Sequence, residues 1–180
     1  MSIFSTFVSA QVLNEGFENV TFPPTGWAVF DNANGSNLWI RNTTATLVCS
    51  GVASARINGQ NVTDGTTAID WLVTPQVLVP ANGQLRFYGK KSQLANFGSI
   101  YTIRVSTASQ TNPTDFTTIQ TWTETDFDYQ NCQQKFVDLA AYVGQNVYVA
   151  FVMENDAGDR WLIDQVKIDE KCLVPTALNV

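Results

Sequence analysis

The chain has 180 residues, of which 44% are hydrophobic and 12% aromatic, whereas only 14% are charged. Its formal net charge is −6 and it contains no His. The few, scattered Lys and Arg residues argue against a nucleic-acid partner, because phosphate binding needs clustered basic side chains, and the lack of His removes Ser-His-Asp and Cys-His catalysis and His-ligated zinc.

The first ten residues, MSIFSTFVSA, resemble the end of a secretory signal peptide. An apolar stretch leads to Val8-Ser9-Ala10, whose small residues suit a cleavage site. The alternative is that residues 1–10 form a leading strand. No apolar run approaches the about twenty residues that a membrane helix needs, so we expect no membrane insertion. The signal-like start predicts a secreted or cell-surface protein.

Short runs of alternating apolar and polar residues recur along the rest of the chain, separated by Gly, Asn and Pro. This spacing is typical of an antiparallel sandwich. The predicted strands are residues 12–17, 27–31, 38–41, 53–57, 70–74, 84–90, 101–106, 117–123, 135–138, 147–153 and 161–168. A short helical connector is expected at 138–144, between an Asp cap and a Gly stop. One domain is predicted over 11–170, with 171–180 as a linker toward a further domain.

Three cysteines, Cys49, Cys132 and Cys172, lie far apart and form no C-x-x-C motif, so a structural zinc site is not expected. In an exported protein one pair closes a disulfide, and the sequence leaves all three pairings open. Three buried, reduced thiols are the alternative.

Four stretches of the sequence resemble one family when they are taken together and in order. They are Gly16-Phe-Glu18 with Phe22-Pro-Pro-Thr-Gly-Trp27; Asp70-Trp-Leu-Val-Thr-Pro75; Tyr101-Thr-Ile-Arg-Val-Ser-Thr107; and Val137-Asp-Leu-Ala-Ala-Tyr142 running to Trp161-Leu-Ile-Asp-Gln-Val-Lys-Ile168. The series is similar to the cleaved-adhesin, or choice-of-anchor J, domains of Bacteroidetes surface proteins. The resemblance implies an all-β jelly-roll sandwich of two antiparallel sheets, related to MAM domains and carbohydrate-binding modules.

The same resemblance implies a structural calcium ion. In such jelly rolls a Glu on the first strand and an Asp on the last converge on a cation, and an Asp/Asn loop completes the shell. Carried onto this sequence, the ligands are Glu18, Asp31, Asn34 and Asp164, with Asp70 as a weaker candidate. Calcium prefers such oxygen ligands. The alternative is that Glu18 and Asp164 only cap strand ends or pair with basic residues.

Sugar binding would use exposed aromatic rings beside polar loops. Trp122, Tyr129 and Trp161 are the candidates, whereas Trp27, Trp39 and Trp71 lie between apolar neighbours and are predicted to be core residues. A glycosidase would need a carboxylate pair, for which Glu124 with Asp126 and Asp128, or Glu154 with Asp156 and Asp159, are available. Acid-rich loops are usually solvated, so we do not expect an enzyme.

We therefore predict a secreted or cell-surface, adhesin-like binding module that contains calcium and binds a glycan or an extracellular protein, in a longer chain with further domains. Two alternatives remain open. One is a structural spacer of a large surface protein, and the other is an accessory domain of an exported protease.

Overall fold

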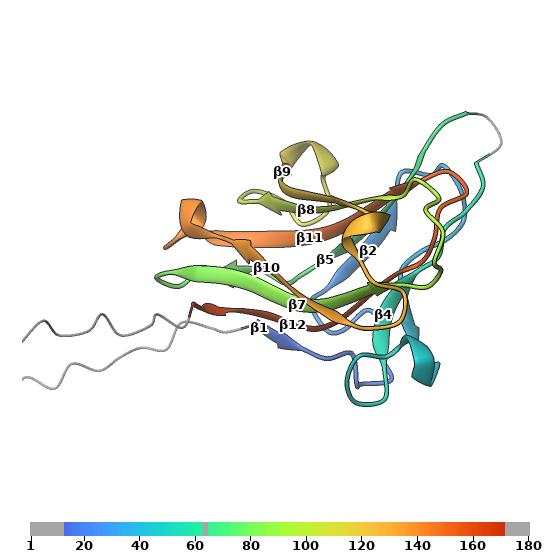
Figure 1. Cartoon of the computed structure of the whole chain (residues 1–180). Helices are drawn as coiled ribbons and strands as arrows, with labels where there is room; N and C mark the ends of the chain where they lie inside the picture. The colour runs from blue at the N-terminus through green and yellow to red at the C-terminus, as the bar shows by residue number, and fades with distance from the viewer. Residues whose placement is uncertain (1–12, 63–64, 172–180) are drawn as a thin grey trace, which may run out of the picture.

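The computed structural model describes residues 13–62 and 65–171. Their structure consists of strands joined by loops and by short 3₁₀ turns (Figure 1). The strands are β1 (Leu13–Glu15), β2 (Ala28–Asp31), β3 (Ile40–Asn42), β4 (Ser54–Ile57), β5 (Ala68–Val73), β6 (Val77–Leu78), β7 (Gly83–Lys91), β8 (Ile100–Ser106), β9 (Thr117–Thr123), β10 (Gln133–Asp138), β11 (Asn146–Asn155) and β12 (Trp161–Glu170). The 3₁₀ turns are η1 (Ala45–Leu47), η2 (Pro113–Asp115), η3 (Glu124–Asp126) and η4 (Ala140–Tyr142).

The strands form two antiparallel sheets that pack as a sandwich. The first sheet has the order β10-β7-β12-β4-β3, with β1 also pairing with β12. The second has the order β2-β5-β11-β8-β9, with β6 pairing with β11. The predicted all-β sandwich of two antiparallel sheets is thus confirmed.

The two ends of the sandwich differ in what they carry. Leu13 at the start of β1 lies opposite Ile168 near the end of β12, so the described chain begins and finishes at one end (left in Figure 1). The connections that follow β2, β4, β7 and β11 gather at the other end. Loops from distant parts of the sequence therefore meet there.

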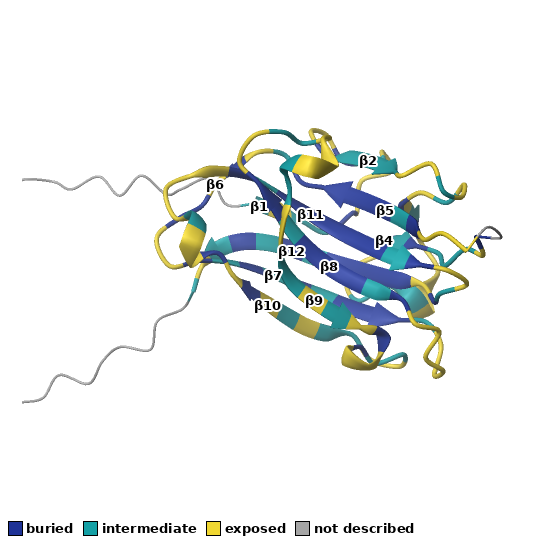
Figure 2. Cartoon of the chain, turned by 90° about the horizontal axis from the view of Figure 1, so that it is seen from above, coloured by how far each residue is buried: buried dark blue, intermediate teal, exposed yellow. Residues whose placement is uncertain are grey.

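The core lies between the sheets because alternate residues of each strand face inward. In β7 the burial pattern alternates over most of the strand, with Leu85 and Phe87 fully buried. Figure 2 shows β5, β8 and β11 buried along much of their length, whereas the edge strands β9 and β10 are more exposed. Trp27 and Trp39 are buried in this core, as predicted.

Trp71 is also buried, but in a second, smaller cluster with Val73, Ala150 and Val152. Its ring stacks on Phe30 at a centroid distance of 5.4 Å and packs against Phe116 at 5.2 Å. Phe116 ends the connection between β8 and β9, so this connection helps to bury the cluster.

The predicted strands are all present, with boundaries that shift by up to two residues. Strand β6 was not predicted, because two residues are too few to show an alternation of apolar and polar side chains. The expected helical connector at 138–144 is a single 3₁₀ turn, and Gly144 follows it with φ 77°.

No helix in the described residues is long and apolar enough to cross a membrane. Residues 1–10 and the linker after Lys171 lie outside the described residues.

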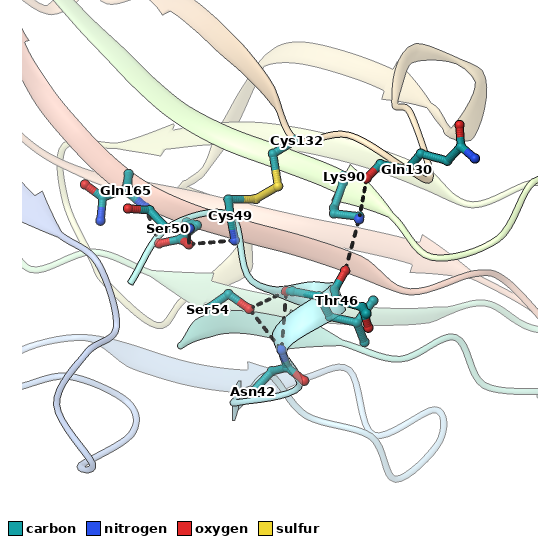
Figure 3. Close-up of a disulfide and its surroundings, with 11 residues drawn as sticks. Asn42, Thr46, Cys49, Ser50, Ser54, Lys90, Gln130, Cys132 and Gln165 are labelled. Atoms are coloured by element: carbon teal, nitrogen blue, oxygen red, sulfur yellow. Dashed lines mark hydrogen bonds between the residues drawn. A yellow bond between two sulfur atoms is a disulfide. The ribbon is translucent and has the colours of Figure 1, made fainter. Parts of the chain in front are cut away.

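A disulfide joins Cys49 to Cys132, with a Cα–Cα distance of 5.7 Å (Figure 3). This is one of the three pairings that the sequence left open. The Nζ of Lys90 donates hydrogen bonds to the carbonyl oxygens of Thr46 and Gln130, both at 3.1 Å. The lysine therefore bridges the same two chain segments that the disulfide joins.

Candidate functional site

The structure divides the predicted calcium ligands between two places. Asp31, Asn34 and Asp70 belong to the loop end of the sandwich, where Asp31 of β2 lies opposite Asp70 of β5. Glu18 and Asp164 lie instead beside the disulfide-bonded loop and both bind its backbone. In the described part of the chain, no three or more Asp, Glu, His or Cys residues are grouped so that they could hold a metal ion.

Asp70 is a buried carboxylate that lacks a full set of partners. Its exposed fraction is 0%, and its Oδ1 atom has no hydrogen-bond partner among the described residues. Burial, and then the charge of Asp31, raise the pKa of Asp70 to about 7, although a hydrogen bond from Gln60 opposes the change. Two facing carboxylates with a free buried oxygen fit a hard cation, because an ion would compensate the buried charge.

Gln60 organises this end of the molecule, and the sequence analysis missed it. Its Oε1 atom accepts hydrogen bonds from the backbone N–H groups of Ser36 (2.8 Å) and Asn37 (3.0 Å). Its Nε2 atom donates to Asp70 Oδ2 at 3.4 Å, and its backbone N–H donates to Asn155 Oδ1 at 2.8 Å. The side chain of Gln60 thus connects the 32–39 loop to β5, and the backbone of Gln60 connects its own loop to β11.

The second pair, Glu18 and Asp164, already has backbone partners. Asp164 Oδ2 accepts hydrogen bonds from the N–H groups of Cys49 (3.1 Å) and Ser50 (2.9 Å), and Glu18 Oε2 accepts one from Val52 (3.0 Å). Burial is the main cause that raises the pKa of Asp164 to about 6, with a smaller contribution from Glu18. Anchoring the loop accounts for both carboxylates without a metal ion.

The three predicted sugar-binding aromatics lie in different environments. The prediction for Trp161 is wrong, because its side chain is fully buried and its ring stacks on Tyr101 at 4.8 Å. Trp122 is half-buried at the edge of the core, where its ring meets Phe127 at a centroid distance of 5.7 Å. Tyr129 is half-buried in the connection before β10. They do not form one exposed platform.

Two of the acids considered as catalytic candidates are buried hydrogen-bond acceptors, not solvated side chains. Glu124 accepts hydrogen bonds from the N–H groups of Phe97 (2.6 Å) and Ser99 (2.9 Å). Asp159 accepts from the N–H groups of Ser92 (3.1 Å) and Gln93 (2.8 Å). Both carboxylates therefore hold the 92–99 loop in place.

A polar hollow of about 340 Å³ lies at the loop end of the sandwich. Residues from the connections that follow β2, β4, β7 and β11 line it: Asn37, Asn58, Gly59, Gln93, Gly158 and Arg160. These residues were not among the predicted site residues, because amides and glycines in loops carry no local signal of binding.

The hollow is built on close backbone packing. A Cβ atom added at Gly59 would lie 1.7 Å from the carbonyl oxygen of Gly158, so the two loops approach more closely than any side chain would allow. Asn37 Nδ2 donates to the carbonyls of Asn58 (3.4 Å) and Gly59 (3.3 Å), which fixes a third loop beside them. A rigid polar recess of this kind suits a small hydroxyl-bearing ligand.

Comparison with known proteins identifies the family. Residues 10–168 match the model of the Cleaved Adhesin Domain. The chain belongs to this family. It is therefore a non-catalytic adhesin domain, as the sequence analysis expected.

The similar proteins fit this assignment. This cleaved adhesin domain is 28% identical over 183 residues to hemagglutinin A of Porphyromonas gingivalis, and the match covers 87% of this chain but 7% of the relative. Its fold matches the K1 cleaved adhesin domain of Lys-gingipain from P. gingivalis W83, with a TM-score of 0.69, 21% identity and coverage of 90% and 99% of the two chains. A xylan-binding domain from Paenibacillus barcinonensis has the same fold, with a TM-score of 0.59, 13% identity and coverage of 91% and 98%.

Proposed function

We propose that this cleaved adhesin domain is a secreted or cell-surface binding module that binds a glycan in the polar hollow at its loop end. The hollow itself carries the proposal. Loops following four strands bring amide groups, a guanidinium and glycine backbone around a volume of about 340 Å³, which lies near the lower end of small-molecule sites, about 300–1,000 Å³. One or two sugar rings fit such a volume.

The chemistry of the lining favours a saccharide over an apolar ligand. The side chains of Asn37, Asn58, Gln93 and Arg160 provide hydrogen-bond donors and acceptors, and the lining contains no aromatic or aliphatic side chain. Sugar hydroxyl groups donate and accept hydrogen bonds, so they match amides well. The similar fold of a xylan-binding domain is consistent with this proposal.

We also propose that calcium binds between Asp31 and Asp70 and supports the hollow. The free buried oxygen of Asp70 and the facing Asp31 fit a hard cation. Asn34, on the loop that Asp31 begins, is available to add an amide or carbonyl oxygen. The same loop leads to Asn37 in the hollow, so an ion at its base would hold one wall in place. The Glu18 and Asp164 pair stays a weaker candidate for calcium.

The binding site is tested with a glycan array followed by calorimetry on the whole chain in calcium buffer. Gln93→Ala removes an exposed amide from the lining. It should weaken glycan binding by roughly three- to tenfold, the usual worth of one hydrogen bond. Gln134→Ala, at an exposed position of β10 outside the hollow, is the matched control and should bind like the parent chain.

Two results would contradict the proposed glycan site. If no glycan binds, the spacer alternative gains support. If a glycan binds and both variants bind it equally well, the site lies elsewhere on the domain.

A further inference from the structure

We infer that the hollow selects saccharides that carry a carboxylate, such as those with uronic or sialic acid residues, and that Arg160 is the residue that selects them. This inference rests on the proposed glycan-binding function and adds the chemical class of the ligand. The relevant features are an unpaired guanidinium, a buried acceptor without a donor, and a lining with no acidic side chain.

Arg160 differs from the other arginines of the chain. Arg86 pairs with Asp169, and Arg104 pairs with Glu154. Arg41 donates to the carbonyl of Phe17, and Arg56 donates to Asn42. Within residues 13–62 and 65–171, the guanidinium of Arg160 makes neither a hydrogen bond nor an ion pair, although it lines the hollow. It is thus available for a ligand.

The acid next to Arg160 in sequence forms no ion pair with it in the described part of the chain. Asp159 is 1% exposed, and both of its carboxylate oxygens accept hydrogen bonds from Ser92, which lies on the neighbouring loop. The guanidinium of Arg56 lies close enough to Arg160 to feel its charge. Burial is the main cause that lowers the pKa of Arg56, and the positive charge of Arg160 lowers it further. Although the chain has a net charge of −6, the lining of the hollow has only a positive charge.

A second feature of the hollow favours a ligand that carries hydroxyl groups. Asn58 lines it, and its Oδ1 atom is buried without a hydrogen-bond partner among the described residues. A buried acceptor without a donor is costly, so a turn of the Asn58 side chain that brings Oδ1 to a ligand hydroxyl would be favoured. A guanidinium binds a carboxylate through two parallel hydrogen bonds. A sugar acid supplies both a carboxylate and hydroxyl groups, whereas an inorganic anion supplies only negative charge and a neutral sugar supplies only hydroxyl groups.

Calorimetry with two matched pairs of probes tests this inference. Trigalacturonate is compared with its methyl ester, and sialyllactose with its methyl ester, so that the members of each pair differ only in whether their carboxylates are charged. We expect the whole chain to prefer at least one acidic probe by about tenfold or more, in the range of a charge-assisted pair. The preferred pair identifies which acid the hollow accepts.

Three variants assign the preference to a residue. Arg160→Gln should abolish the preference for the acid, so that the acidic and the neutral probe bind this variant equally through the remaining amides of the lining. Arg160→Lys, which keeps the charge but not the planar fork, should retain part of it. Lys167→Gln removes one positive charge from β12, outside the lining of the hollow, and should retain all of it. Thermal melts check that each variant is folded.

Other results would overturn the inference. Equal binding of acid and neutral probe by the parent chain, with weaker binding of both to Gln93→Ala, would reject acid selection and keep the glycan site. A preference that survives in Arg160→Gln, or that falls equally in Lys167→Gln, would reject the role of Arg160. Failure of every probe to bind, together with an empty glycan array, would remove the proposed function as well.

Discussion

Replacing both Cys49 and Cys132 by Ser is expected to lower the free energy of unfolding by about 4.5 kcal/mol, the loop-entropy value for a closed loop of this size. The two residues are 83 positions apart, so the disulfide removes a large part of the conformational freedom of the unfolded chain. Lys90 still bridges the two segments through Thr46 and Gln130, but hydrogen bonds constrain only the folded state. Urea unfolding of both proteins measures the difference.

A reductant provides the control for this prediction. Dithiothreitol should lower the urea midpoint of the parent chain toward that of the double variant, and it should leave the double variant unchanged. Equal midpoints of the oxidised parent and the variant would contradict the entropic role of the disulfide.

Calcium is expected to raise the melting temperature by about 5–10 °C when it is present at about 100 times its dissociation constant, because it binds only the folded state. With the ion between Asp31 and Asp70, Asp70→Asn should remove most of this increase. Asp164→Asn is the matched control at the other pair and should keep it. The reverse result, with the response lost in Asp164→Asn, would move the ion to Glu18 and Asp164, and no response in the parent chain would remove calcium altogether.

Without calcium, Asp70 should make the domain less stable as the pH rises. Its pKa is raised from 3.8 to about 7 in the folded chain, so the folded state holds the proton more tightly than the unfolded state does. Stability contributed by this proton is fully present below about pH 4 and is lost as the pH rises through about 7. The pKa of Asp164 is raised to about 6, so deprotonation of this residue also lowers the stability of the domain, but at a lower pH.

Thermal melts in EDTA between pH 4 and pH 8 measure this effect. Asp70→Asn should be more stable than the parent chain at pH 8 and should show a flatter pH profile. A parent chain whose stability does not fall between pH 5 and pH 8 would contradict the raised pKa.

The sequence predicted the fold well because strand alternation and turn residues are local signals. It predicted Trp161 and Trp122 with equal weight, since both lie beside polar loops. The difference between them depends on position in the sheets: Trp161 is on a central strand and faces the core, and Trp122 is on the edge strand β9. Only the assembled sheets distinguish the two.

The hollow could not be predicted for a related reason. Asn37, Asn58, Gln93 and Arg160 are separated by many residues and meet only when four loops reach the same end of the sandwich. Gln60, likewise, is one amide among many in the sequence, and its role depends on contacts with Asp70 and Asn155. The family resemblance implied Glu18, Asp31 and Asp164 as calcium ligands and Asp70 only as a weaker one. The sequence does not show that the backbone of the disulfide-bonded loop already binds Glu18 and Asp164.

The pairing of Leu13 with Ile168 has a mechanical consequence. Tension applied through the two chain ends would pull β1 and β12 apart from the same end, so the hydrogen bonds between them would break one after another rather than all at once. Strand β1 has only three residues, and it would detach first. The loops at the far end carry none of this load directly, so a ligand bound there would stay held while the base of the domain yields.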